Sequence, residues 1–284
     1  MEHKEPASPA ELYLDLMKKC LTRLIFPDPY RPVTRPPLHT SPLAWAVYPS
    51  VDRVLGARGL KVCRYAPVDP AKRAEGRDWP AQADTMVGLR RLDNLQYCIT
   101  EILRKNVPGD LIETGVWRGG ASIFMRAVLK AYGDRMRSVW VADSFEGLPK
   151  PDGRYSQDIG DQHWTLKSVL GVSLEQVKAN FARYGLLDGQ VRLLAGWFKD
   201  TLPTAPITQL AILRLDGDMY SSTMDTLQNL YPKLSPGGYA IIDDYGSYPT
   251  CKQAVDDFRA GRRITEQLER IDWAGVFWEK RAQG

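Results

Sequence analysis

From residue 109 onwards, short apolar runs alternate with longer segments in which apolar residues recur every three or four positions. The short runs predict buried strands at residues 110–113, 138–142, 191–195, 210–215 and 239–242. The longer segments predict the helices that connect them, including one over residues 121–132. After a helix around Phe258, two more strand-like runs follow at Ile264–Leu268 and Gly275–Trp278. Alternating strands and helices predict a doubly wound α/β sheet.

Residues 210–246 are the most informative part of this pattern, because they read as strand, helix, strand. Such a unit makes the two strands parallel, so their carboxyl ends share one edge of the sheet. The first strand ends in Asp216 and the second in Asp243 and Asp244. If the strands are neighbours, three carboxylates meet there, and a bound cation would relieve their repulsion. The intervening helix is predicted to begin after Ser222.

The first hundred residues are less regular. An amphipathic helix is predicted over residues 12–26 and a long helix over residues 86–103, but five prolines between residues 28 and 42 exclude a helix there. We expect residues 1–105 to form a helical or irregular cap or lid and residues 106–284 to form the catalytic domain. The plain alternative is an N-terminal extension that only supports packing or a dimer contact.

Composition narrows the class of protein. The chain has 284 residues, of which 44% are hydrophobic and 25% charged, so it can bury a large core. The net charge of +4 is modest and scattered, which does not favour nucleic-acid binding. No apolar run is long enough for a membrane helix, and residues 1–12 have no apolar signal core. Four dispersed cysteines suit a reducing compartment, so we expect a cytoplasmic protein.

The turn after the first predicted strand points to an adenosine-bearing cofactor. Its glycines at positions 115, 119 and 120 let backbone amides approach a ligand closely. Asp143 ends the next strand, where an acid suits the two hydroxyls of a ribose. The glycine spacing is not that of a dinucleotide-binding turn. Glu113, at the end of the first strand, suits a cationic ligand such as S-adenosylmethionine.

Five blocks of sequence resemble the macrocin O-methyltransferase family, whose members methylate sugar hydroxyls on antibiotic glycosides. They are ETGVWRGG (113–120), VWVADSFEGLP (139–149), GWFKDTLP (196–203), LRLDGDMY (213–220) and PGGYAIIDDYG (236–246). The resemblance also covers LYLDLMKKCLTRLI (12–25), whereas residues 28–75 depart from it. It implies a seven-stranded class I methyltransferase sheet, Rossmann-like and with a terminal antiparallel strand, an N-terminal helical lid, S-adenosylmethionine, Mg²⁺ and a homo-oligomer.

The resemblance also assigns roles to residues by motif. It places the methionine end of the cofactor against Glu113, Thr114, Gly115 and Arg118. It places the ribose at Asp143 beside Ser144, and the adenine near Gly196 and Trp197. It makes Asp216, Asp243 and Asp244 the metal ligands. Met86, in the stretch Thr85–Gly88, resembles a lid residue that contacts the ligand.

Methyl transfer to an alcohol also needs a group that takes the hydroxyl proton. Asp216 is our candidate base, Asp218 is the alternative, and His163 is a third candidate, although an isolated loop histidine is more often simply solvated. The expected partner is a small-molecule glycoside. A catechol or another vicinal diol would fit the same metal geometry. Two other classes stay open, an NAD-dependent sugar oxidoreductase and a catalytically silent binding subunit.

Overall fold

A single seven-stranded sheet organises the molecule. The computed structural model describes residues 8–27, 29–33, 42–78 and 82–282. Strand order across the sheet is β5-β4-β3-β6-β7-β9-β8, and β9 runs antiparallel to both of its neighbours. The strands are β3 (Asp110–Thr114), β4 (Val139–Asp143), β5 (Val191–Ala195), β6 (Leu210–Leu215), β7 (Leu234–Ile242), β8 (Glu269–Arg270) and β9 (Val276–Glu279). The predicted doubly wound sheet, with its antiparallel terminal strand, is therefore confirmed.

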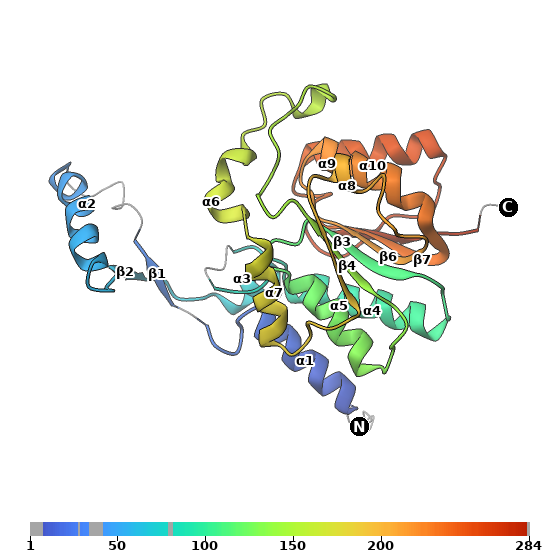
Figure 1. The fold of residues 1–284 in the computed structure, drawn as a ribbon, viewed down its shortest axis with the longest axis horizontal. Coiled ribbons are helices and arrows are strands. Elements are labelled where there is room, and N and C mark those ends of the chain that lie inside the picture. The colour runs from blue at the N-terminus through green and yellow to red at the C-terminus, as the bar shows by residue number, and fades with distance from the viewer. Residues whose placement is uncertain (1–7, 28, 34–41, 79–81, 283–284) are drawn as a thin grey trace.

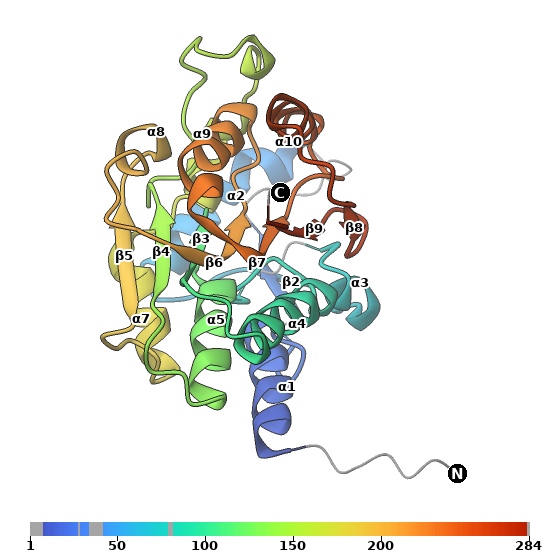
Figure 2. The ribbon, with the colours of Figure 1, turned by 90° about the vertical axis from the view of Figure 1, so that its right-hand side faces the viewer.

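Helices cover both faces of this sheet, as Figure 2 shows. One face packs against α1 (Pro9–Leu21), α4 (Leu89–Arg104), α5 (Gly120–Ala131) and α7 (Leu174–Arg183). The other packs against α8 (Phe198–Thr201), α9 (Tyr220–Leu230) and α10 (Pro249–Arg262). Side chains alternate between the two faces along each strand, so Leu111 lies in the first core and Ile112 in the second. Burial on both faces explains why the central strands read as unbroken apolar runs.

The unit β6–α9–β7 forms as predicted, with β6 and β7 adjacent and parallel. Leu215 pairs with Ile242, which sets the acids that follow the two strands side by side. The predicted start of the helix at Ser222 was wrong, because α9 begins at Tyr220 with Met219 as its N-cap residue. The cap comes from a distant loop. Buried Asp158 accepts hydrogen bonds from the backbone N–H groups of Tyr220 and Ser221, both at 2.9 Å.

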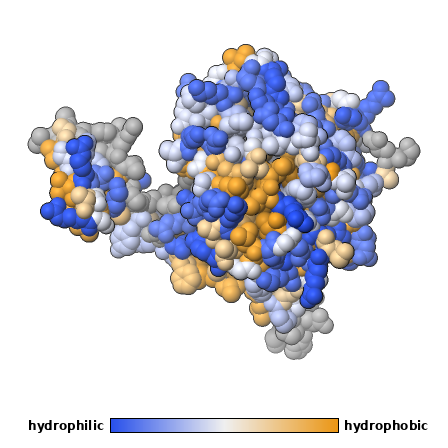
Figure 3. Space-filling view, viewed as in Figure 1, coloured by the Kyte–Doolittle hydropathy of each residue, from blue (hydrophilic) through white to orange (hydrophobic). Residues whose placement is uncertain are grey.

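The N-terminal helices α1 and α4 pack against α5 and share its hydrophobic core. Helix α1 buries Leu14 and Leu21 there, while Leu12 and Leu16 on its other side are exposed. Between α1 and α4, the strands β1 (Tyr30–Pro32) and β2 (Cys63–Tyr65) and the helix α2 (Pro42–Gly56) form an arm. This arm stands away from the body in Figures 1 and 3. The domain boundary at residue 105 stays a prediction.

Several shorter elements complete the chain. A short helix α3 (Pro70–Ala74) precedes α4, which begins at Leu89 rather than at Met86 because Gly88 is its N-cap residue. The segment between β4 and α7 holds the 3₁₀ turns η1 (Ser156–Asp158) and η2 (His163–Leu166) and the helix α6 (Lys167–Leu170). A third 3₁₀ turn, η3 (Tyr231–Lys233), follows α9.

One predicted strand is not present in the structure. The strand predicted at Ile264–Leu268 was wrong: these residues connect α10 to β8 without regular structure, and only Glu269 and Arg270 pair with β9. Within the described part of the chain, no helix has the length and apolar character needed to cross a membrane.

Candidate active site

The glycine turn after β3 lies directly against the end of β6. Gly115 has φ +86°, and a Cβ atom placed on it would lie 1.8 Å from the carbonyl oxygen of Asp216. The backbone N–H of Asp216 donates to the carbonyl of Thr114 at 2.9 Å. Only glycine combines this left-handed conformation with so close an approach. The predicted cofactor turn and the predicted acidic site are therefore in backbone contact.

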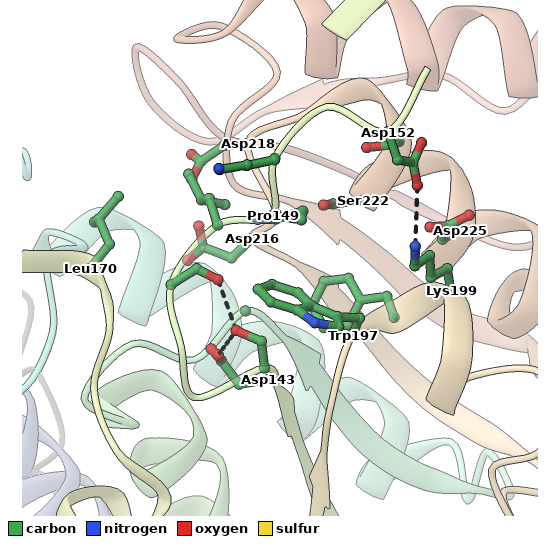
Figure 4. A pocket seen from close by; sticks show the side chains of 18 of the residues that line it. Asp143, Pro149, Asp152, Leu170, Trp197, Lys199, Asp216, Asp218, Ser222 and Asp225 are labelled. Carbon is green, nitrogen blue, oxygen red and sulfur yellow. Dashed lines mark hydrogen bonds and ion pairs between the residues drawn. The ribbon is translucent and has the colours of Figure 1, made fainter. Parts of the chain in front are cut away.

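Asp143 ends β4 and is held by main-chain amides. One carboxylate oxygen accepts from Val116 N–H and the other from Phe145 N–H, both at 2.7 Å. Burial raises the pKa of Asp143, and these hydrogen bonds oppose that shift. The carboxylate faces a cavity of about 290 Å³ that Gly115, Ser144, Trp197 and Met86 also line. Figure 4 shows Asp143 and the indole of Trp197 together on one side of this cavity, with Asp216 and Asp218 on the other.

Four other residues predicted for the cofactor do not line this cavity. Glu113 is buried and accepts hydrogen bonds from Arg214 and Ser122. Burial raises the pKa of Glu113 to about 7, and the guanidinium of Arg214 opposes the shift. The other three support the turn or strand around them. Thr114 contacts Thr226 in the core, Arg118 donates to Ala83 O and stacks on Trp117, and Gly196 turns the chain with φ +134°.

An acidic cluster stands at the carboxyl ends of β6 and β7. Carboxylate oxygens of Asp216, Asp218 and Asp244 all lie within 4.8 Å of one another. These acids face a second cavity, of about 370 Å³, which Met86 and Glu113 also line. Burial, and then the neighbouring carboxylates, raise the pKa of Asp218 to about 7 and that of Asp244 well above its ordinary value. The pKa of Asp216 rises to about 6 for the same reasons, although Arg214 opposes it. Of the three acids predicted to converge here, Asp216 and Asp244 are in the cluster, and Asp218 is its third member.

Asp243, the fourth acid, is placed differently. Its two carboxylate oxygens accept hydrogen bonds from two buried arginines, Arg91 and Arg214. Arg214 also contacts Glu113 and, at 2.9 Å, Asp216, whereas Arg91 also bonds Asp272 at 2.9 Å. Asp243 lines the second cavity but lies outside the cluster of three. Sequence reasoning missed both arginines. A signal existed for Arg214, the only charged residue in the apolar run of β6, but Arg91 lies on an ordinary amphipathic helix.

The segment between β4 and α7 lies over this edge of the sheet and contributes to the lining of both cavities, and we call it the covering segment. Arg154 makes a two-pronged ion pair with Asp225 of α9 at 2.8 and 2.9 Å. Together with the Asp158 cap, this pair ties the segment to the beginning of α9. Lys150, Leu170 and Arg154 line the first cavity, and His163 lines the second.

Comparisons with known proteins agree with this geometry. The family model described as Macrocin-O-methyltransferase (TylF) matches residues 10–280. The 8-demethyl-8-(2,3-dimethoxy-alpha-L-rhamnosyl)-tetracenomycin-C 4'-O-methyltransferase of Streptomyces olivaceus is 53% identical over 275 residues, which cover 96% of this chain and 94% of the relative. The mycinamicin III 3''-O-methyltransferase of Micromonospora griseorubida is 45% identical over 280 residues, covering 98% and 99%.

A solved structure, that of the O-methyltransferase NovP, superposes with a TM-score of 0.81 at 47% sequence identity, covering 96% of this chain and 100% of that one. Sequence and structure therefore give the same assignment, and the chain belongs to the macrocin O-methyltransferase family.

Proposed function

We propose that this protein transfers a methyl group from S-adenosylmethionine to a sugar hydroxyl of a glycosylated natural product, such as an antibiotic. The observation that carries the proposal is the contact between the glycine turn and the end of β6, which sets a cofactor-sized cavity beside a cluster of carboxylates. The names of the relatives supply the acceptor class, since they act on a rhamnosyl tetracenomycin and on mycinamicin III.

The first cavity suits the methyl donor. Gly115 leaves room for close approach at the turn, and the indole of Trp197 offers a flat apolar surface for an adenine. Asp143 and Ser144 line the same cavity and offer oxygen atoms that suit the hydroxyls of a ribose. The negative charge of the nearby acids favours a sulfonium over a neutral cofactor.

The acidic cluster also fits Mg²⁺. Its donors are all carboxylate oxygens, which this ion prefers, and their raised pKa values reflect a repulsion that a cation would remove. Asp216 and Asp244 would hold it. The third ligand is Asp243 in the family pattern, whereas the arrangement of side chains offers Asp218. When bound, the ion would lower the pKa of the acceptor hydroxyl and fix its orientation.

The chain's own residues would carry out the remaining steps. The methyl–sulfur bond breaks as the methyl–oxygen bond forms, and the hydroxyl proton leaves to a carboxylate. Asp216 and Asp218 are the candidate bases, and both line the cavities on either side of the reacting position. Their pKa values of about 6 and about 7 suit proton transfer near neutral pH. The Arg154–Asp225 ion pair holds the covering segment, which limits the access of water.

A methyl-transfer assay tests the proposal. The panel would contain mycinamicin III, demethyldecarbamoylnovobiocin and a dimethoxyrhamnosyl tetracenomycin, the acceptors named for the relatives, together with a simple catechol. We expect a mass gain of one methyl group on at least one glycoside, dependent on S-adenosylmethionine and abolished by EDTA. Calorimetry supplies the contrary outcome: binding of NAD but not of S-adenosylhomocysteine would remove the proposal.

We also propose a homo-oligomer. Apolar residues are exposed on two helices, Leu12 and Leu16 on α1 and Val47, Val51 and Val54 on α2. Light scattering at micromolar concentration would show a mass of at least twice 32.0 kDa. A monomer at that concentration would contradict this part of the proposal.

A further inference from the structure

His163 lies in the segment between β4 and α7, about fifty residues before the nearest acid of the cluster, yet it faces the same cavity. The cavity is lined by Asp216, Asp218 and Asp244 and, from the covering segment, by His163. Its imidazole lies within electrostatic reach of Asp218. The fold therefore brings the ring to the place where an acceptor hydroxyl would bind.

The ring is held in one orientation by two neighbours. Asp161 accepts from the imidazole Nδ1 at 2.9 Å, and it also accepts from the backbone N–H of His163 at 2.7 Å. Tyr248, at the start of α10, packs edge-on against the ring with centroids 5.1 Å apart and an interplanar angle of 90°. An aspartate on Nδ1 fixes the tautomer with the proton on that atom. Nε2 is then a hydrogen-bond acceptor of fixed direction.

Two polar atoms at this place have no partner. Within the described ranges, nothing hydrogen-bonds to His163 Nε2 or to the hydroxyl of Tyr248. Burial, and then the charges of Asp218 and Asp244, raise the pKa of Tyr248, which places its hydroxyl within the field of the acidic cluster. Both atoms are accessible rather than fully buried, so they can meet a ligand in the cavity that their residues line. An acceptor-and-donor pair at the edge of a cavity matches the hydroxyl groups of a sugar.

We propose that His163 and Tyr248 form the acceptor-recognition pair of this enzyme. Nε2 of His163 accepts a hydrogen bond from one hydroxyl of the sugar, and the Tyr248 hydroxyl donates to an oxygen of the same ring. Asp161 is a positioning residue that acts through the imidazole. The inference rests on the proposed function, because it assumes a hydroxylated acceptor in the second cavity.

A set of variants tests the assignment on the full-length protein. His163→Phe keeps the contact with Tyr248 but removes both ring nitrogens, whereas His163→Gln restores a polar group near the position of Nε2. Tyr248→Phe removes only the hydroxyl. Ser168→Ala is the control, because Ser168 is exposed on the same segment and lines neither cavity.

The readouts are steady-state kinetics with the best glycoside of the panel, and calorimetric binding of that glycoside to protein saturated with S-adenosylhomocysteine. We expect His163→Phe to raise KM and Kd for the glycoside at least tenfold, and Tyr248→Phe about fivefold. KM for S-adenosylmethionine should stay within twofold of the unmodified protein. His163→Gln should recover part of the glycoside affinity, and Asp161→Asn should lose less than His163→Phe.

Each outcome is decisive. Glycoside KM and Kd within twofold of the unmodified protein in His163→Phe overturn the assignment while leaving the proposed function standing. Equal losses of affinity for both substrates indicate a structural role only and also overturn it. If the unmodified protein methylates no glycoside, the proposed function fails and this assignment fails with it.

Discussion

Asp143 and the Asp216–Asp218–Asp244 cluster are both acids at the carboxyl edge of one sheet, but their surroundings differ. Asp143 is held by backbone N–H groups at 2.7 Å from two separate turns. The cluster has few such donors, since the Asp244 carboxylate accepts only long hydrogen bonds, from the backbone N–H of Asp218 at 3.4 Å and from the hydroxyl of Ser247 at 3.3 Å. The main chain therefore stabilises the carboxylate of Asp143, whereas the carboxylates of the cluster mainly face one another.

The difference teaches how to interpret an acid at a strand end. Such a position alone does not distinguish a structural carboxylate from a ligand, since Asp143, Asp243 and Asp244 all occupy one. The donors already present make the distinction. Two arginines neutralise Asp243, while no cation in the described part of the chain pairs with Asp218 or Asp244. Carboxylates without a paired cation, such as those of Asp218 and Asp244, are therefore the better candidates for a functional role.

The strongest test removes charge from the cluster itself. Asp216→Asn should lower the methyl-transfer rate about 10⁴-fold, because it removes both a proposed metal ligand and a candidate base. The affinity for S-adenosylhomocysteine should stay within a fewfold of that of the unmodified protein, since Gly115, Asp143 and Trp197 remain in place in the first cavity. Single-turnover kinetics and calorimetry measure the two quantities. A variant with a tenth or more of the original rate would show that Asp216 is not part of the chemistry.

Substitutions of Asp243 and of Asp218 should have opposite effects on the free energy of unfolding, measured in EDTA. Asp243→Asn leaves two buried guanidinium groups without their shared carboxylate, so the free energy of unfolding should fall by about 3–5 kcal/mol. Asp218→Asn relieves repulsion and should leave that free energy unchanged or raise it. Denaturant unfolding followed by circular dichroism measures both. The same variants, titrated with Mg²⁺, identify the third ligand as the one whose loss weakens binding more. Equal destabilisation would contradict the distinction between the two acids.

Gly115→Ala tests whether the close contact between the glycine turn and the Asp216 carbonyl is needed for folding and for cofactor binding. Its Cβ would meet the Asp216 carbonyl at 1.8 Å, so we expect a loss of about 3 kcal/mol in stability and no detectable cofactor binding. Gly133→Ala is the matched control. Gly133 also has a positive φ, +72°, but nothing lies within 4 Å of its Cβ position, so only the backbone strain of about 1 kcal/mol remains. Similar losses of stability in the two variants would mean that backbone strain, rather than the contact with Asp216, explains the need for glycine at position 115.

The smallest expected effect is a pH dependence in the absence of metal. The pKa of Asp218 rises from 3.8 to about 7 on folding, so the folded state binds a proton that the unfolded state has lost. The stabilisation is therefore fully present below about pH 4 and is lost as the pH rises towards 7. Because Asp218 is half-buried, we expect a change of about 1–2 kcal/mol. Unfolding curves in EDTA should show it, and Asp218→Asn should flatten it. An identical slope in that variant would assign the effect elsewhere.

Much of the fold could be predicted from the pattern of apolar residues. The runs at β5 and β6 gave those strands their correct limits. The signal was clearest at β6, which is buried along its whole length and so needs a largely apolar sequence. The pairing of β6 with β7 followed from the connecting helix. The α9 cap could not be predicted, since Asp158 reaches it from another loop some sixty residues earlier. Local pattern carries no information on such contacts.

In the candidate site, too, the residues set by local pattern could be predicted and those set by long-range contacts could not. Asp143, Gly115 and the acids of β6 and β7 were identifiable because strand ends and glycine turns are encoded locally. Arg91 was not, because its partners Asp243 and Asp272 lie 152 and 181 residues away. The role expected for Thr114 also depended on side-chain direction. Its hydroxyl lies between β6 and α9 rather than at the turn, which the sequence alone does not reveal.

The contact of Gly115 with Asp216 has a consequence for how this family could diversify. The relative placement of donor and acceptor is built into the main chain of β3 and β6, so substitutions in the arm or in the covering segment leave it intact. New acceptors could then be gained by substitutions in the segment that carries His163, without realigning the reacting atoms. Chimaeras that carry a relative's segment between β4 and α7 on this chain's sheet should inherit the relative's choice of sugar and this chain's rate of transfer.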